Sequence, residues 1–120
     1  MSSVNITSED ELLLLSKKYD TLNKAEAIAK SKVILPDGRI RYYAPEVPAK
    51  TSGPMRGAGM VTEYDPRTGC VRQWYESRDH AGDVVRVHPK NINGIDFNPS
   101  NPVPHYPYIF KDLQQLKGKK

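Results

Sequence analysis

The sequence predicts an α+β domain in which N-terminal helices pack on a twisted antiparallel sheet of about four or five strands. Helix-forming residues at helical spacing fill the first 32 residues. Short β-prone runs separated by tight turns follow, over residues 33–108. The 120 residues suffice for one modest core, so we expect residues 1–120 to form a single domain.

Two capping patterns predict the helices. Ser8 followed by Glu11 has the form of a capping box, because the hydroxyl can accept from the amide three residues on while the glutamate reaches back. This pattern predicts a first helix over residues 9–18. Asn23 and Glu26 repeat the pattern, which predicts a second, alanine-rich helix.

A hairpin is expected next. Asp37-Gly38, flanked by apolar and β-prone residues, is a strong hairpin signal that pairs residues 33–35 with residues 39–43. Prolines at positions 45, 48 and 54 cannot donate ladder hydrogen bonds. Residues 44–54 are therefore expected to form a connecting loop.

Three further strands are predicted to form a meander. They cover residues 60–64, 70–76 and 83–88, with turns at residues 65–69 and 77–83. Gly82 is the expected positive-φ residue of the second turn, and Pro89 is expected to close the last strand. A proline-rich loop then leads to a last helix over residues 109–117.

Composition bounds the environment and the partners. The net charge of +4 and the pI near 9.2 are compatible with a polyanionic partner such as RNA. Cys70 is the single cysteine, which excludes an intrachain disulfide, and we expect an exposed thiol at a turn. No apolar run approaches the ~20 residues needed to span a bilayer, so no membrane association is expected. We expect no export signal in the chain itself, so that export would require a larger polypeptide.

The strand at residues 83–88 carries the residues best suited to chemistry. Side chains alternate across a strand, so Val85 and Val87 are expected to face the core while Arg86 and His88 look outward together. Lys90 follows directly. This surface is positively charged and, with a histidine reference pKa of about 6.5, titratable near neutral pH.

These residue types suit RNA strand cleavage without a metal or other cofactor. The 2′-hydroxyl must lose a proton, the leaving 5′-oxygen must gain one, and the charge on the phosphorane must be stabilised. The predicted catalytic set is His88, Glu63, His105, Arg86 and Lys90. The predicted substrate-binding residues are Arg56, His80, Tyr106 and Tyr64.

Each candidate also has a structural interpretation. His80 can close a turn by hydrogen-bonding backbone, and His105 can be a packed loop histidine. Trp74 is expected in the core. Arg72 and Arg78 are expected to be solvated or paired with Glu76 and Asp79.

Metal chemistry is the rival enzymatic hypothesis. The three histidines with Asp79, Asp83 and Asp96 supply ligand types for an ion. The sequence has neither an HExxH pattern nor an aspartate-rich calcium loop, so this hypothesis ranks second.

Several motifs together resemble a known family. They are RIRYY, GPxRG, VTEYDPRTGxVRxW, DHxGxVxRVHPK and HYP, spread over residues 39–107. In combination they resemble a C-terminal toxin domain of bacterial polymorphic toxins, the modules that end Rhs/YD-repeat, WapA-like and contact-dependent inhibition proteins. Two positions depart from the expected pattern: Ile95 stands where glutamine is expected, and HYPYI replaces HYPP.

The resemblance implies a mode of action. Such a domain is part of a larger toxin-delivery polypeptide, acts in the cytoplasm of a target bacterium, and is neutralised at home by a cognate immunity protein. Many members are small ribonucleases with the barnase/EndoU/colicin/RelE-like fold. The matched polar residues are Arg56, Glu63, Tyr64, His80, Arg86, His88, Lys90, His105 and Tyr106.

Three functions follow as hypotheses. The first is an antibacterial endoribonuclease that cleaves tRNA or another structured RNA by attack of the 2′-hydroxyl. The second is a metal-dependent DNase toxin. The third is a non-enzymatic module that binds RNA or a protein.

Overall fold

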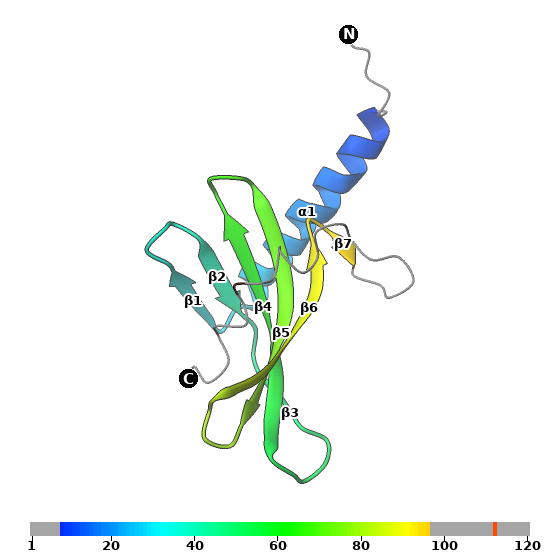
Figure 1. The fold of residues 1–120 in the computed structure, drawn as a ribbon. Helices are drawn as coiled ribbons and strands as arrows, with labels where there is room; N and C mark the ends of the chain where they lie inside the picture. Colours follow the sequence, from blue (N-terminus) through cyan, green and yellow to red (C-terminus); the bar gives the residue numbers. More distant parts are fainter. Residues whose placement is uncertain (1–7, 97–111, 113–120) are drawn as a thin grey trace.

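The computed structural model describes residues 8–96 and Asp112, and the described part is an α+β fold, as predicted (Figure 1). One helix packs on an antiparallel sheet. The elements in order are α1 (Ser8–Ile28), β1 (Ser31–Ile34), β2 (Ile40–Tyr43), β3 (Val47–Pro48), β4 (Met55–Asp65), β5 (Cys70–Asp79), β6 (Val84–Ile92) and β7 (Ile95–Asp96). The predicted last helix, His105 and Tyr106 lie outside the described residues.

The sheet is built around its two longest strands, β4 and β5. The strand order is β1-β2-β4-β5-β6-β7, with every pair antiparallel and β3 added on β4. Helix α1 crosses one face of the sheet, and its N-terminal half extends beyond the sheet (Figure 1). Leu22 and Ala25 of α1 form a small core with Tyr42 and Val71.

The prediction of two helices was wrong, because α1 is continuous. Asn23 lies inside the helix and does not cap a second one. No glycine or proline interrupts residues 8–28, so nothing in the local sequence breaks the helix. Leu12, Leu13 and Leu15, near its start, are exposed. Burial in α1 is instead concentrated in its C-terminal half.

The turns follow the sequence signals. The first hairpin pairs β1 with β2, and Gly38 in its turn has φ +94°. Gly69 and Gly82 also have positive φ, in the β4–β5 and β5–β6 turns. The loop over residues 44–54 contains a short strand that was not predicted. Pro48 tolerates this position, opposite Gly57, because β3 is a two-residue edge strand.

Strand β6 differs from its prediction in two ways. It continues through Pro89 to Ile92, pairing Pro89 with Trp74 beside a register shift. At a second shift, Val84 and Arg86 pair with neighbouring residues of β5, and Val85 has no partner in the register. Val84 is 2% exposed, whereas Val85 is 42% exposed. The prediction that Val85 faces the core was therefore wrong, because a β-bulge breaks the simple alternation.

The sheet buries side chains on both faces. Residues opposite one another in an antiparallel pair share a face, and neighbours along a strand alternate. One face carries Val71 and Gln73 and packs against α1; we call it the helix face. The other carries Arg72 and Trp74; we call it the arginine face. Trp74 is fully buried there, as predicted for a core tryptophan.

Within residues 8–96 and at Asp112, no helix combines the length and the apolar composition needed to cross a lipid bilayer.

Candidate functional site

A buried carboxylate surrounded by arginines lies at the middle of the arginine face. Arg41 on β2, Glu63 on β4 and Arg72 on β5 are directly opposite one another in register. Arg41 Nε donates to Glu63 Oε2 at 2.8 Å, and Arg72 Nε donates to Glu63 Oε1 at 2.8 Å. Arg39 Nη1 also donates to Glu63 Oε2, at 3.2 Å. Because Glu63 is only 3% exposed, its charge has little contact with water. The three guanidiniums compensate this buried charge in place of water.

Trp74 fixes two of these arginines in place. The guanidinium carbons of Arg41 and Arg72 each lie 5.3 Å from the centre of the indole ring. This distance is typical of a cation–π contact. The indole Nε1 donates to Glu76 Oε2 at 3.0 Å, and Arg78 Nη2 donates to Glu76 Oε1 at 2.9 Å. The cluster therefore rests on a preorganised, hydrogen-bonded layer.

Asp112 supplies a second carboxylate to the cluster. Arg72 Nη1 donates to Asp112 Oδ1 at 2.9 Å, and Arg72 Nη2 donates to Asp112 Oδ2 at 2.7 Å. Burial raises the pKa of Asp112, but the hydrogen bonds and charge of Arg72 and the charge of Arg39 outweigh it, so the pKa lies below its ordinary value. Burial lowers the pKa of Arg72, but the hydrogen bonds and charges of Asp112 and Glu63 raise it by more. The pKa therefore lies above its ordinary value, and the side chain stays charged.

A cavity of about 340 Å³ opens beside these groups. Its charged lining consists of Arg39, Arg67, Arg72, Glu63, Asp65 and Asp112. Three arginines face three carboxylates, so the charged lining is neutral overall. The cavity therefore brings carboxylates and guanidiniums together at one place on the arginine face.

The predicted catalytic residues do not all meet at one place. His88 lies opposite Tyr75 and Arg86 opposite Ser77, which places both side chains on the helix face. Both are exposed, so the prediction that they look outward together is confirmed. Glu63 lies on the arginine face, however. The predicted combination of His88 with Glu63 was wrong, because the sheet separates them.

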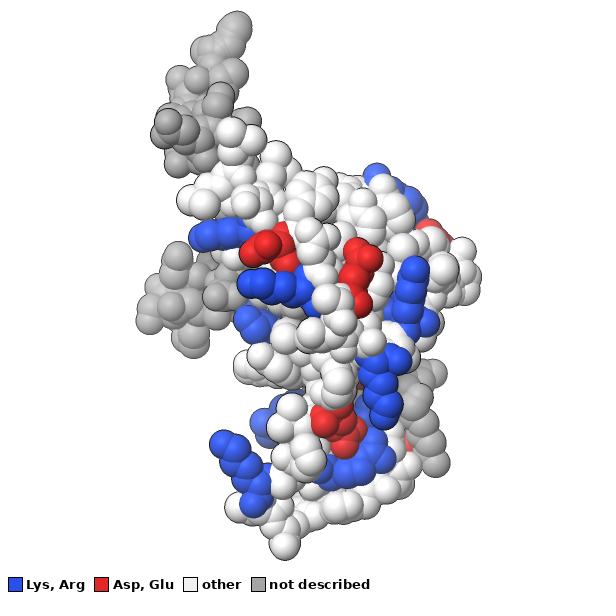
Figure 2. All heavy atoms as spheres, turned by 180° about the vertical axis from the view of Figure 1, so that it is seen from behind, with Lys and Arg blue, Asp and Glu red and all other residues white. Residues whose placement is uncertain are grey.

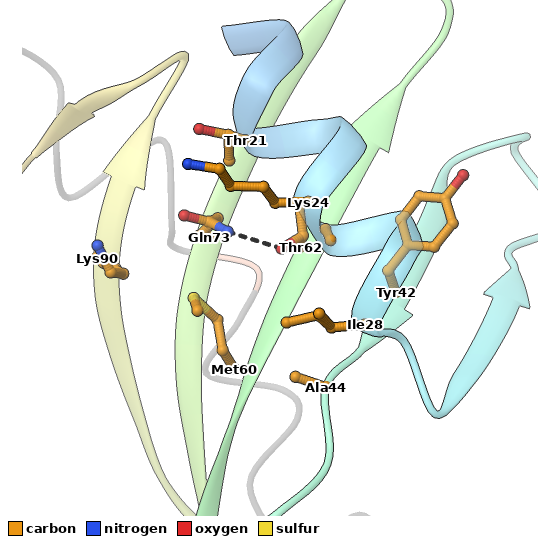
Figure 3. A pocket seen from close by; sticks show the side chains of 10 residues that line it. Thr21, Lys24, Ile28, Tyr42, Ala44, Met60, Thr62, Gln73 and Lys90 are labelled. Atoms are coloured by element: carbon orange, nitrogen blue, oxygen red, sulfur yellow. Dashed lines mark hydrogen bonds between the residues drawn. The ribbon is translucent and has the colours of Figure 1, made fainter. Parts of the chain in front are cut away.

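Lys90 lines a different cavity, of about 240 Å³, between α1 and the helix face (Figure 3). Its polar wall is a hydrogen-bonded chain: Gln73 Nε2 donates to Thr62 Oγ1 at 2.8 Å, and Asn91 Nδ2 donates to Gln73 Oε1 at 2.8 Å. Lys24 from α1 is also in the lining. Amides and ammonium groups suit binding more than proton transfer near neutral pH.

The predicted substrate-binding residues lie elsewhere. Arg56 makes two 2.8 Å hydrogen bonds to the carboxylate of Glu46. His80 Nε2 lies 2.8 Å from the backbone carbonyl of Gly53, so the structural interpretation of His80 as a backbone-bonding turn residue is confirmed. Tyr64 is partly buried and packs against the small core under α1.

The helix side of the molecule is not a uniform basic surface. Seen from behind the view of Figure 1, its lysines and arginines are spread out, with acidic residues among them (Figure 2). Basic and acidic side chains are therefore mixed on this side. The dense grouping of arginines lies around Glu63.

Sequence reasoning missed the three partners of Glu63, which are Arg39, Arg41 and Arg72. It also missed Asp112, which pairs with Arg72 and Arg39. The expectation that Arg72 is solvated or paired with Glu76 or Asp79 was wrong, because it is buried against Glu63 and Asp112. A usable signal was present. Arginines two apart in RIR, and an arginine two before tryptophan in RQW, share a strand face by alternation.

Cys70 also differs from its prediction. Its thiol is partly buried, and this burial raises the pKa of Cys70 despite the nearby charge of Arg72.

In the part of the chain that the structure describes, no group of three or more histidine, cysteine or acidic side chains is placed to hold a metal ion. Comparisons with protein-family models, with curated proteins and with solved structures gave no match to this chain.

Proposed function

We propose that this chain is a metal-independent endoribonuclease that cleaves tRNA or another structured RNA by attack of the 2′-hydroxyl on the adjacent phosphodiester. One observation carries the proposal. The carboxylate of Glu63 lies within 2.8–3.2 Å of three guanidinium groups, beside a cavity of about 340 Å³. A carboxylate can take the proton of the 2′-hydroxyl and guanidiniums can stabilise the phosphorane, which are two of the three requirements of the reaction.

Each group has a part in the reaction. Glu63 accepts the proton of the 2′-hydroxyl as the oxygen attacks phosphorus, a contribution typically worth roughly 10²–10⁴-fold in rate. Arg39 and Arg72 line the cavity and stabilise the charge that develops on the phosphorane. Arg41, which is buried, holds the carboxylate of Glu63 in position. The P–O5′ bond breaks, which leaves a 2′,3′-cyclic phosphate and a 5′-hydroxyl.

The roles assigned to other residues change accordingly. His88 and Arg86 lie across the sheet from Glu63, so we expect them to take no part in bond cleavage. His105, predicted from the sequence, remains our proposed proton donor to the leaving oxygen, with Tyr106 beside it in the sequence as a base-stacking residue.

The biological setting is proposed from the resemblance over residues 39–107. The domain would reach the cytoplasm of a target bacterium as part of a larger toxin-delivery polypeptide, and a cognate immunity protein would neutralise it. Toxicity on cytoplasmic expression, relieved by a co-expressed partner, supports this setting and counts against a non-enzymatic binding module.

Cleavage in excess EDTA tests the reaction directly. The purified chain is incubated with tRNA, the cut is mapped, and the substrate is remade with a 2′-deoxynucleotide at that position. We expect EDTA-resistant cleavage to a 2′,3′-cyclic phosphate, and no cleavage of the deoxy-substituted RNA. Cleavage of DNA that EDTA abolishes would instead establish the metal-dependent DNase.

A further inference from the structure

We infer that Arg39 and Arg72 form the site for the scissile phosphate, and that the carboxylate of Asp112 occupies this site in the resting protein as an internal competitor. The inference rests on the proposed function and specifies how its site is regulated. A guanidinium binds a carboxylate and a phosphate through the same pair of parallel hydrogen bonds. Asp112 therefore shows where two oxygens of a bound phosphate would lie.

Arg72 contacts both carboxylates. Its Nε atom donates to Glu63, while Nη1 and Nη2 donate to the two oxygens of Asp112 at 2.9 and 2.7 Å. Arg39 Nη1 lies 3.4 Å from Asp112 Oδ2 and 3.2 Å from Glu63 Oε2. A phosphate in place of Asp112 would thus be held by both arginines, next to the proposed proton acceptor.

The two carboxylates differ in how readily an external anion can replace them. The side chain of Glu63 is 3% exposed, whereas that of Asp112 is 43% exposed. Solvent ions can reach Asp112 directly, while Glu63 is enclosed by its arginines. A phosphate would therefore displace Asp112 and leave Glu63 in place.

Charge supports the same conclusion. The lining of the cavity holds three arginines and three carboxylates and is neutral, so release of Asp112 leaves a net charge of +1. A neutral cavity does not attract a polyanion, whereas a positive one does. Only molecules in which Asp112 has left the site can bind phosphate. The apparent affinity for phosphate is therefore the intrinsic affinity multiplied by the fraction of such molecules.

Phosphate binding to the full chain tests the inference. Inorganic phosphate is titrated by calorimetry into the parent protein, Asp112→Asn and Glu46→Gln. The last variant removes the same charge at the separate Arg56 pair. We expect Asp112→Asn to bind phosphate at least about tenfold more tightly, the scale of a lost charge-assisted hydrogen bond, and Glu46→Gln to behave as the parent. Equal affinities, or an equal gain in both variants, would overturn the inference.

A measurement on the unmodified protein covers the case in which Asp112→Asn does not fold. Phosphate is titrated while the side-chain carboxyl resonance of Asp112 is followed by NMR. Displacement should shift this resonance and move the pKa of Asp112 back toward its ordinary value. An unchanged resonance at saturating phosphate would show that Asp112 does not compete.

RNA cleavage separates this inference from the proposed function. At subsaturating RNA, Asp112→Asn should cleave faster than the parent. Tighter phosphate binding without cleavage by any variant would retain the anion site and refute the ribonuclease. Equal cleavage and equal phosphate affinity would retain the ribonuclease and refute the competition.

Discussion

Glu63 and His88 lie on opposite faces of the same sheet. Glu63 is opposite Arg72 in the β4–β5 register, and His88 is opposite Tyr75 in the β5–β6 register. Arg72 and Tyr75 are three residues apart on β5, an odd spacing that sends their side chains to different faces. Glu63 and His88 therefore do not share an active site, and Glu63 is the residue to which we assign the chemistry.

The first prediction concerns His88. Replacing it with alanine should leave the rate of RNA cleavage within about twofold of the parent, because its exposed side chain is separated from the cavity by the sheet. Single-turnover cleavage of mapped RNA provides the rate. A tenfold or larger fall, with unchanged RNA affinity, would return the chemistry to the helix face.

The second prediction concerns the layer beneath the arginines. Trp74→Phe keeps an aromatic ring but removes the N–H that donates to the buried Glu76. We expect the free energy of unfolding to fall by about 1–3 kcal/mol, the range for leaving a buried polar group without its partner. Urea unfolding measures this quantity. Tyr75→Phe, on the other face and partly exposed, is the control and should lie within about 0.5 kcal/mol of the parent.

The third prediction concerns pH and Cys70. Burial raises the pKa of its thiol, so the folded protein should react with iodoacetamide more slowly than the urea-denatured chain at the same alkaline pH. The unfolded chain ionises first, at a pKa of about 8.5. The contribution of Cys70 to stability is therefore present below that pH and declines as pH rises toward the folded pKa. Equal reaction rates in the two states would show that the thiol is not shielded.

The fourth prediction compares two glycines with similar backbone angles. Gly94 has φ +83° and an added Cβ would lie 2.9 Å from Lys17 Cβ on α1, whereas Gly38 has φ +94° and open space around it. Alanine at either position strains the backbone. Gly94→Ala should destabilise the fold by about 1 kcal/mol or more beyond Gly38→Ala, since it also overpacks the contact with the helix. Similar urea midpoints for the two variants would contradict that contact.

The sequence was informative wherever local chemistry decides the structure. Gly38, Gly69 and Gly82 have positive φ, which glycine adopts without strain. All three lie in turns that the sequence predicted. The same turn signals, which separate short β-prone runs, led to the prediction of the α+β class. The capping pattern at Asn23 misled because it lies between good helix formers, and a helix ends only where a cap or breaker outweighs continued hydrogen bonding.

The site was harder to predict because register is a tertiary property. Two bulges in β6 decide which side chains share a face, and neither has a distinct signal in the sequence. Glu63 was among the predicted catalytic residues, but its partners Arg41 and Arg72 on β2 and β5 were not predicted, nor was the pairing of Arg72 with Asp112. Asp112 follows its partner Arg72 by 40 positions, a separation at which no local pattern predicts a contact.

The most direct test of the account is the rate of RNA cleavage in excess EDTA by Glu63→Gln, relative to the parent and to His88→Ala. Loss of this buried charge leaves its arginines uncompensated and can cost about 3–5 kcal/mol of stability. Glu63→Asp, which keeps the charge and shortens the side chain, is therefore measured alongside, with urea unfolding of each protein. We predict a fall of roughly 10²–10⁴-fold for Glu63→Gln, a clear fall for folded Glu63→Asp, and no change for His88→Ala. Parent-like cleavage by folded Glu63→Gln or Glu63→Asp would contradict the central claim.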